Sequence, residues 1–232
     1  MVSSGGRPRG GYPRKPGADR SRSATGFFVA LVENCTVTNE VRCLTNLSDV
    51  AEEIRDGDLL LFRGRGVVAR LIGVAGRSDY THAARVVWWG NDLFCCEVRE
   101  LKGGRAVTLE SQVRRFPGDI DVFEVNPSSR WREFDRRGAV RFMRRLAGCD
   151  YGYRGVLTAA LRHLPIWRFL VKPDSDDQRF CKEPPFCSQA CAMADRMGGG
   201  VDPVPHLADR LTEPADLARS PFYRYRFTLG GV

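Results

Sequence analysis

Residues 81–99 read THAARVVWWGNDLFCCEVR, and this stretch decides the fold class. It contains two runs rich in branched and aromatic residues, 82–89 and 93–99, with Gly90-Asn91 between them. Glycine and asparagine tolerate the left-handed backbone that a tight hairpin turn requires, and the flanking residue types favour strands. The stretch therefore predicts an antiparallel β-hairpin.

The pairing of this hairpin brings two polar side chains together. If the turn lies between Trp89 and Asp92, these two residues face each other across the hairpin. Because side chains alternate between the faces of a strand, His82 and Glu97 then share a face as diagonal neighbours, about 7–8 Å apart between backbones. A four-residue loop gives the same pairing, whereas a three-residue loop would place them on opposite faces.

The remaining apolar patterns predict an α+β protein built on an antiparallel sheet, because strands cluster before helices. Further strands are expected at 26–37, 58–62, 119–125 and 223–227. Helices are expected at 48–54, 131–146, 151–164 and 187–197, and a polar loop at 172–185. Asp56-Gly57 predicts a turn, and Ser48 is the expected N-cap of the first of these helices.

Cys187 lies in a stretch of sequence that favours a reactive thiol. Pro184-Pro185 interrupts the preceding chain, and the helix predicted after it carries Cys187 in its first turn. Backbone N–H groups and the positive end of the helix dipole favour the thiolate there and lower the pKa of the thiol. With His82 and Glu97, Cys187 supplies the groups that thiol-dependent acyl transfer uses: a nucleophile, a base and a carboxylate.

The positive charge is concentrated at the beginning of the 232-residue chain. Residues 1–25 hold six basic side chains and one acidic one, and so supply five of the eight formal net positive charges. They predict a disordered basic tail, followed by one globular domain over residues 26–232. Since that domain carries only the remaining three net charges, nucleic-acid binding has little support beyond the tail.

The sequence predicts neither a secretory leader nor a membrane span. The first 25 residues lack an apolar core, and the longest apolar stretch, 155–171, is interrupted by charged residues and a proline. A membrane-spanning helix needs roughly 20 mostly apolar residues. We therefore expect a cytoplasmic protein whose eight cysteines are free thiols.

Three separated motifs resemble one enzyme family. Thr81-His82-Ala83 opens a predicted strand, Cys96-Glu97-Val98 lies on the next strand, and Phe186-Cys187-Ser188-Gln189 opens a late helix. In this order they resemble the circularly permuted, YiiX-like branch of the NlpC/P60 papain-like cysteine hydrolases. Asp56-Gly57-Asp58-Leu59-Leu60 and segment 212–221 add to the resemblance, which covers about residues 54–229. It implies a permuted papain-like fold, with a small, barrel-like antiparallel sheet packed against helices.

The resemblance also implies a role for each residue of the site. Cys187 is the expected nucleophile, His82 the general base and acid, and Glu97 the group that orients the imidazole. The implied reaction is hydrolysis of an amide or peptide bond, for instance in cell-wall-type peptides, without a cofactor or metal. Where the unpermuted enzymes have a tyrosine before the nucleophile, this chain has Phe186, so the backbone N–H of Cys187 is the expected oxyanion donor.

Two other functions fit the same residues. The related lecithin–retinol acyltransferase branch suggests acyl transfer or thioester hydrolysis on lipid substrates, with the apolar segment 156–171 as a lid. A non-enzymatic binding module, recruited by the basic tail, is the third hypothesis. The arginine-rich face of 130–145 is expected to be solvated, and a contact with a membrane surface is its alternative.

The site residues also have structural alternatives. Cys187 could be a buried packing residue and His82 a hydrogen-bonded core histidine. Glu97 could pair with Arg99 or Arg85 instead of His82.

Other histidines and cysteines offer further candidates. His163 and His206 are alternative bases, the first in an apolar stretch and the second in a proline-rich loop. Cys191, one helical turn after Cys187, is expected to pack in the core, and a redox pair between the two is the alternative. A zinc site is disfavoured because the sequence contains no C-x-x-C pair.

Overall fold

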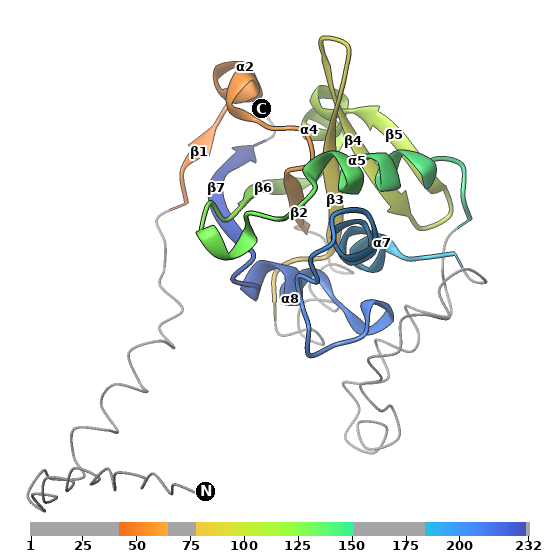
Figure 1. Cartoon of the computed structure of the whole chain (residues 1–232). Helices are drawn as coiled ribbons and strands as arrows, with labels where there is room; N and C mark the ends of the chain where they lie inside the picture. Colours follow the sequence, from red (N-terminus) through yellow and green to blue (C-terminus); the bar gives the residue numbers. More distant parts are fainter. Residues whose placement is uncertain (1–41, 65–77, 151–183, 231–232) are drawn as a thin grey trace, which may run out of the picture. The chain divides into compact units, whose positions relative to one another are not determined.

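The computed structural model describes residues 42–64, 78–150 and 184–230 (Figure 1). Within these ranges, seven strands form one sheet in the order β1-β7-β6-β2-β3-β4-β5. The strands are β1 Leu44–Thr45, β2 Leu59–Gly64, β3 His82–Trp89, β4 Asp92–Arg99, β5 Gly103–Thr108, β6 Gly118–Val125 and β7 Tyr223–Gly230. Neighbouring strands are antiparallel except β1 and β7, which run parallel. The chain therefore has the predicted α+β class and a mostly antiparallel sheet.

The sheet is open, in contrast to the barrel-like sheet that the resemblance implies. In the described part of the chain, the row of strands ends at β1 on one side and at β5 on the other. These two edge strands do not pair with each other, so the sheet does not close within the described residues.

The hairpin of β3 and β4 has the predicted register. Trp89 pairs with Asp92, and Arg85 pairs with Cys96. Gly90 lies in the turn with a φ of +61°, a left-handed conformation that glycine adopts without steric cost. Because the register determines which side chains share a face, the first residue of β3 lies on the same face as Glu97.

The sheet buries a separate apolar cluster on each face. On one face, helices α5 (Arg136–Arg145) and α7 (Cys187–Met193) cover a cluster that includes Leu59, Leu61, Ala83 and Val87 (Figure 1). On the other face, helix α4 (Leu109–Arg115) covers a cluster that includes Leu60, Phe62, Ala84 and Val86. Burial on both faces explains why the first four residues of β2 are all apolar.

The helical segment that begins at Cys187 continues one residue beyond the predicted end at 197. Its α-helical part, α7, continues through a π-helical segment, η5 (Ala194–Gly198). This segment packs closely against α5, since a Cβ added at Gly138 would lie 2.0 Å from the backbone oxygen of Gly198. Glycine at 138 therefore allows the late helix to approach α5.

The helix predicted at 131–146 is shorter than expected. Helix α5 begins at Arg136, because the side chain of Asp135 accepts a hydrogen bond from the backbone N–H of Gly138 at 2.9 Å and caps the helix there. Trp131 belongs to a separate 3₁₀ turn, η2 (Ser129–Trp131).

The N-cap predicted for the first helix is wrong. Helix α2 (Leu47–Val50) follows Asn46, so Ser48 lies inside the helix and not before it. A 3₁₀ turn, η1 (Ala51–Glu53), completes the segment. Ser48 donates its hydroxyl to Asp49 at 2.9 Å, so this side chain binds its neighbour instead of the helix end.

Two adjacent elements were not predicted. Strand β5 and helix α4 occupy residues 103–115. Thr108, the last residue of β5, caps α4 by accepting a hydrogen bond from the backbone N–H of Ser111 at 3.4 Å. Near the other end of the chain, a 3₁₀ turn η6 (Asp209–Leu211) and helix α8 (Pro214–Arg219) precede β7, which contains the strand predicted at 223–227.

Several predictions fall outside the described residues. They are the basic tail at 1–25, the strand at 26–37, the helix at 151–164 and all but the end of the loop at 172–185. Among the helices that the structure describes, none combines the length and apolar character needed to cross a membrane.

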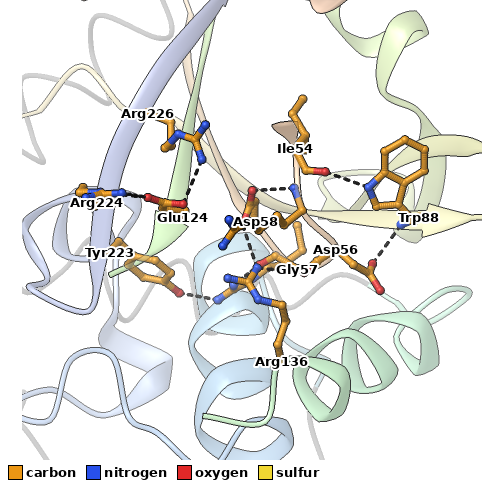
Figure 2. A network of polar contacts seen from close by, with 12 residues as sticks. Ile54, Asp56, Gly57, Asp58, Trp88, Glu124, Arg136, Tyr223, Arg224 and Arg226 are labelled. Carbon is orange, nitrogen blue, oxygen red and sulfur yellow. Dashed lines mark hydrogen bonds and ion pairs between the residues drawn. The ribbon is translucent and has the colours of Figure 1, made fainter. Parts of the chain in front are cut away.

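The predicted turn at 56–57 is the centre of a polar network (Figure 2). Asp58, which is almost fully buried, accepts hydrogen bonds from the backbone N–H of Arg55 at 2.9 Å and from Arg136 of α5 at 2.8 Å. Asp56 accepts one from the backbone N–H of Trp88 on β3 at 3.0 Å. The motif that adds to the family resemblance therefore connects β2 to β3 and α5.

Candidate active site

Two strands of one hairpin and a helix about 100 residues later meet at the start of β3. His82 is the first residue of β3, Glu97 lies on β4, and Cys187 is the first residue of α7. Nε2 of His82 lies 2.5 Å from Oε2 of Glu97, and the imidazole also forms a hydrogen bond with the Cys187 thiol. Since Nε2 faces the carboxylate, Nδ1 is the ring nitrogen left for the sulfur. The structure thus brings together all three residues that the sequence singled out.

The start of α7 is held by contacts on either side of Cys187. Phe186 is extended, with φ of −97° and ψ of 178°, and its backbone N–H donates to the side chain of Gln189 at 3.4 Å. Ser188 is fully buried and donates its hydroxyl to the backbone oxygen of Thr212 at 2.8 Å. These contacts fix the point at which the helix begins, and hence the position of the thiol.

The His82 ring lies at the boundary between the core and solvent. Its side chain is 17% exposed, while that of Glu97 is fully buried. The ring packs edge-on against Phe62 of β2 with centroids 5.1 Å apart. The imidazole is therefore oriented by both a carboxylate and an aromatic neighbour, and it stays partly exposed to solvent.

The contact between His82 and Cys187 shifts the pKa values of both groups. Burial alone would lower the pKa of His82, but the charge of Cys187 and hydrogen bonds to Cys187 and Glu97 outweigh it and raise the pKa to about 9. Burial alone would raise the pKa of the Cys187 thiol, but His82 and the backbone N–H groups of Ala83 and Ser188 hold it below its usual value of 9. Both shifts favour a thiolate beside an imidazolium.

The other buried cysteines have the opposite shift. Burial raises the pKa of Cys95 well above its usual range, and it raises the pKa values of Cys96 and Cys191 to about 12. Cys191 lies fully buried in the core with a free thiol, as the packing interpretation predicts. Cys187 thus differs from these three neighbours in the form of the thiol that its surroundings favour.

The Glu97 carboxylate binds several groups besides His82. Arg105 pairs with Glu97 across β4 and β5, and its Nε donates to Oε1 of the carboxylate at 2.8 Å. Gln112 of α4 donates to Oε2 at 3.3 Å, and Arg99 lies 3.7 Å from Oε1. Burial opposes ionisation of Glu97, but His82 and Arg105 outweigh it and lower the pKa to about 2. The carboxylate is therefore ionised at neutral pH.

Arg105 and Gln112 were not predicted as partners of Glu97, because neither β5 nor α4 was expected from the sequence. The pair Gly103-Gly104 is a turn signal directly after β4. A second hairpin at that point would have placed Arg105 opposite Glu97.

Arg85 lies on the other face of β3, so the predicted alternative in which it pairs with Glu97 is wrong. Its guanidinium pairs instead with Asp195 of η5 and donates to the backbone oxygen of Gly57 at 2.7 Å. The hydroxyl of Tyr223 from β7 contacts both members of the pair. This buried cluster joins β3 to the helical segment that follows α7.

The surroundings of the thiol also bear on the expected oxyanion site. Phe186 is buried beside Cys187. Tyr80, two residues before His82, donates its hydroxyl to Asp121 at 2.7 Å, so that hydroxyl already has a partner. The backbone N–H of Cys187 remains the donor that we expect for an oxyanion.

The remaining candidates are placed as follows. His206 is exposed in its proline-rich loop, and His163 lies outside the described residues. Within the ranges that the structure describes, no group of three or more His, Cys, Asp and Glu side chains is arranged to hold a metal ion.

Comparison with known proteins identifies a structural likeness. No family model and no curated protein matches the sequence. Among solved structures, the chain is similar to the metalloprotein YiiX from Escherichia coli O157:H7, DUF1105. The sequences are 14% identical and the TM-score is 0.51, over 74% of this chain and 96% of that chain. At this identity the likeness concerns the fold, and the chain therefore has a YiiX-like fold.

Proposed function

We propose that this chain is a thiol-dependent hydrolase of the permuted NlpC/P60 type. Cys187 would be the nucleophile, His82 the general base and acid, and Glu97 the carboxylate that orients His82. The proposal rests on the line of contacts from Glu97 through His82 to Cys187, in which the pKa of the imidazole is raised and that of the thiol is lowered. A YiiX-like fold is compatible with an enzyme, and the order of the three motifs supports the family assignment.

The geometry suits a two-step hydrolysis of an amide. The Cys187 thiolate attacks the carbonyl carbon, and a C–S bond forms while the carbonyl oxygen takes the negative charge. Collapse of this intermediate breaks the C–N bond, and His82 gives its proton to the departing amine. Water then attacks the thioester while His82 accepts one of its protons, and the carboxylic acid leaves as the thiolate is restored. Glu97 keeps the ring oriented through both steps.

The substrate class follows from the resemblance. Cell-wall-type peptide amides are the substrates that it suggests. Acyl transfer to another acceptor would use the same thioester, but its suggested lid at 156–171 lies outside the described residues. The binding-module hypothesis depends on the tail at 1–25, which also lies outside them. The described contacts would serve hydrolysis and acyl transfer alike, and hydrolysis is proposed because the three motifs resemble that branch.

Thiol labelling at pH 6 tests the proposal. The intact mass of the protein is followed during reaction with iodoacetamide, for the natural sequence and for Cys187→Ala, His82→Ala and Cys43→Ser. Ordinary thiols are mostly protonated at this pH and react slowly. We expect one fast adduct that is lost in Cys187→Ala and at least about 10-fold slower in His82→Ala. Cys43 is exposed, so Cys43→Ser is the control and should leave the fast adduct unchanged.

Slow labelling spread over several cysteines, regardless of Cys187→Ala, would contradict the proposal. If the fast adduct is found, peptide amides and acyl esters can be compared as substrates by mass spectrometry. A stable acyl group on Cys187 from a lipid ester, without turnover of peptides, would favour the acyltransferase instead.

A further inference from the structure

The carboxylate that contacts His82 is shared between two cations. Glu97 presents Oε2 to the imidazole and Oε1 to Arg105, whose Nε lies 2.8 Å away. A second guanidinium nitrogen of Arg105 contacts the same oxygen. The side chain of Glu97 is fully buried, while 23% of the Arg105 side chain is exposed. Glu97 therefore faces a permanent cation on one side and a titratable one on the other.

Arg105 is held in this position by the sheet. It lies directly opposite Glu97 in the pairing of β4 and β5, where side chains on one face come closest. Next to it, a Cβ added at Gly104 would lie 1.7 Å from the backbone oxygen of Leu146, so the chain after α5 packs against this edge strand. The backbone of β5 is thereby fixed, and the guanidinium reaches the carboxylate without rearrangement.

The other groups near Glu97 and Arg105 are uncharged, more exposed to solvent, or further from the carboxylate. Arg99 of β4 lies 3.7 Å from Oε1 and is 39% exposed, so solvent screens it more than Arg105. Other neighbours among the described residues are the uncharged Gln112 and Phe62, the thiols of Cys95 and Cys96, whose pKa values are raised, and Cys187 on the far side of the ring. Arg105 is therefore the main source of positive charge on the Glu97 side of the imidazole.

The charge state of this carboxylate matters for proton transfer. An uncompensated carboxylate in contact with an imidazolium stabilises the proton on the ring, and a buried one does so strongly. A general acid must release that proton to the leaving group. An arginine on the same carboxylate offsets this attraction and does not itself titrate, since its guanidinium stays charged.

We propose that Arg105 is a positioning residue whose charge offsets that of Glu97, so that the carboxylate orients His82 without holding its proton too firmly. The catalytic meaning of this inference rests on the proposed hydrolase function. The electrostatic effect on His82 does not, because it requires only the observed contacts.

Histidine NMR tests the inference without a substrate. The C–H signals of the three histidines are titrated, and the signal of His82 is identified by its absence in His82→Ala. We expect Arg105→Gln to raise the pKa of His82 by about one unit, because the charge of Glu97 is no longer offset. Arg105→Lys keeps a cation but loses the two-nitrogen contact, and it should raise the pKa by a smaller amount. Arg114→Gln removes an exposed arginine of α4 that pairs with Glu110 at 3.9 Å, and it is the matched control.

The titration is repeated in the Cys187→Ala background, where no thiolate acts on the ring. An upward shift there, together with an unchanged control, supports the role of Arg105 whether or not Cys187 is an active nucleophile. If Arg105→Gln does not fold, the shift in Arg105→Lys decides. An unchanged or lower pKa of His82 in the folded Arg105 variants would overturn the inference, and a slow thiol in the natural sequence would overturn only the proposed hydrolase.

Discussion

The two faces of β3 carry two ion pairs that differ in their access to solvent. On one face, His82 contacts Glu97 and keeps 17% of its side chain exposed. On the other, Arg85 contacts Asp195 and is only 1% exposed. Both pairs lie close to the same late helix, one at its first residue and one in the π-helical segment that follows it.

The difference separates a partly exposed pair, which the proposed hydrolase would use, from a buried pair that contributes to stability. His82 is the first residue of the strand, where its ring contacts the Cys187 thiol and stays partly exposed to solvent. Arg85, three residues further on, lies under the helix, where water cannot replace its partners. We therefore expect changes on the Arg85 face to alter stability, and changes on the His82 face to alter the protonation of the site.

Breaking the buried pair should have the largest effect. Arg85→Met leaves Asp195 buried without its cation, and it should lower the free energy of unfolding by about 3 kcal/mol. Urea unfolding at pH 7 measures this loss, with the exposed Arg114→Met as a control that should change little. A loss below about 1 kcal/mol would mean that Arg85 does not hold the two elements together.

The register of the hairpin could be predicted because both strands alternate clearly and Gly90-Asn91 is a strong turn signal. The observed register places Arg85 and Glu97 on opposite faces, which is why the alternative pair between them does not form. Asp195 and Tyr223 could not be assigned as partners of Arg85, because they come from elements more than 100 residues later in the chain.

The second largest effect concerns acid stability and the face of β3 that carries His82. The pKa of Glu97 is about 2 in the folded protein and 4.5 ordinarily. A lowered pKa contributes stability that is present above about pH 4.5 and is lost as the pH falls toward 2. Between pH 5 and pH 2.5, Glu97 alone should account for about 2 kcal/mol of this loss, and Glu97→Gln should not show that part of it. Urea unfolding at pH 5 and pH 2.5 measures the difference, and equal losses in both proteins would contradict the assigned pKa.

The smallest effect tests whether the two faces of β3 act independently. Tyr223→Phe removes one hydroxyl from the buried cluster around Arg85 and Asp195. It should lower the free energy of unfolding by about 1 kcal/mol. The rate at which Cys187 is labelled at pH 6 should stay the same, because the hydroxyl lies on the face away from the imidazole. A labelling rate that falls 10-fold would show that the two faces are coupled.

The candidate site was only partly predictable for a physical reason. Cys187, His82 and Glu97 belong to segments with strong local signals: two prolines before a helix, and a regular hairpin. Arg105 belongs to β5, which begins with two glycines and lacks a clear apolar alternation. The position of Arg105 opposite Glu97 is set by the pairing of β5 with β4, which the local sequence does not reveal. The early helix shows the same limit, because either of two neighbouring polar residues, Asn46 and Ser48, could cap it.

The thiolate–imidazolium pair can be tested by measuring the pKa of His82 in the natural sequence and in Cys187→Ala. We expect a value of about 9 in the natural sequence, because a thiolate lies beside the ring. In Cys187→Ala the value should fall, because the negative charge beside the ring is removed while the contact with Glu97 remains. A value near 6.5 in both proteins would contradict the account, because no thiolate–imidazolium pair would then exist.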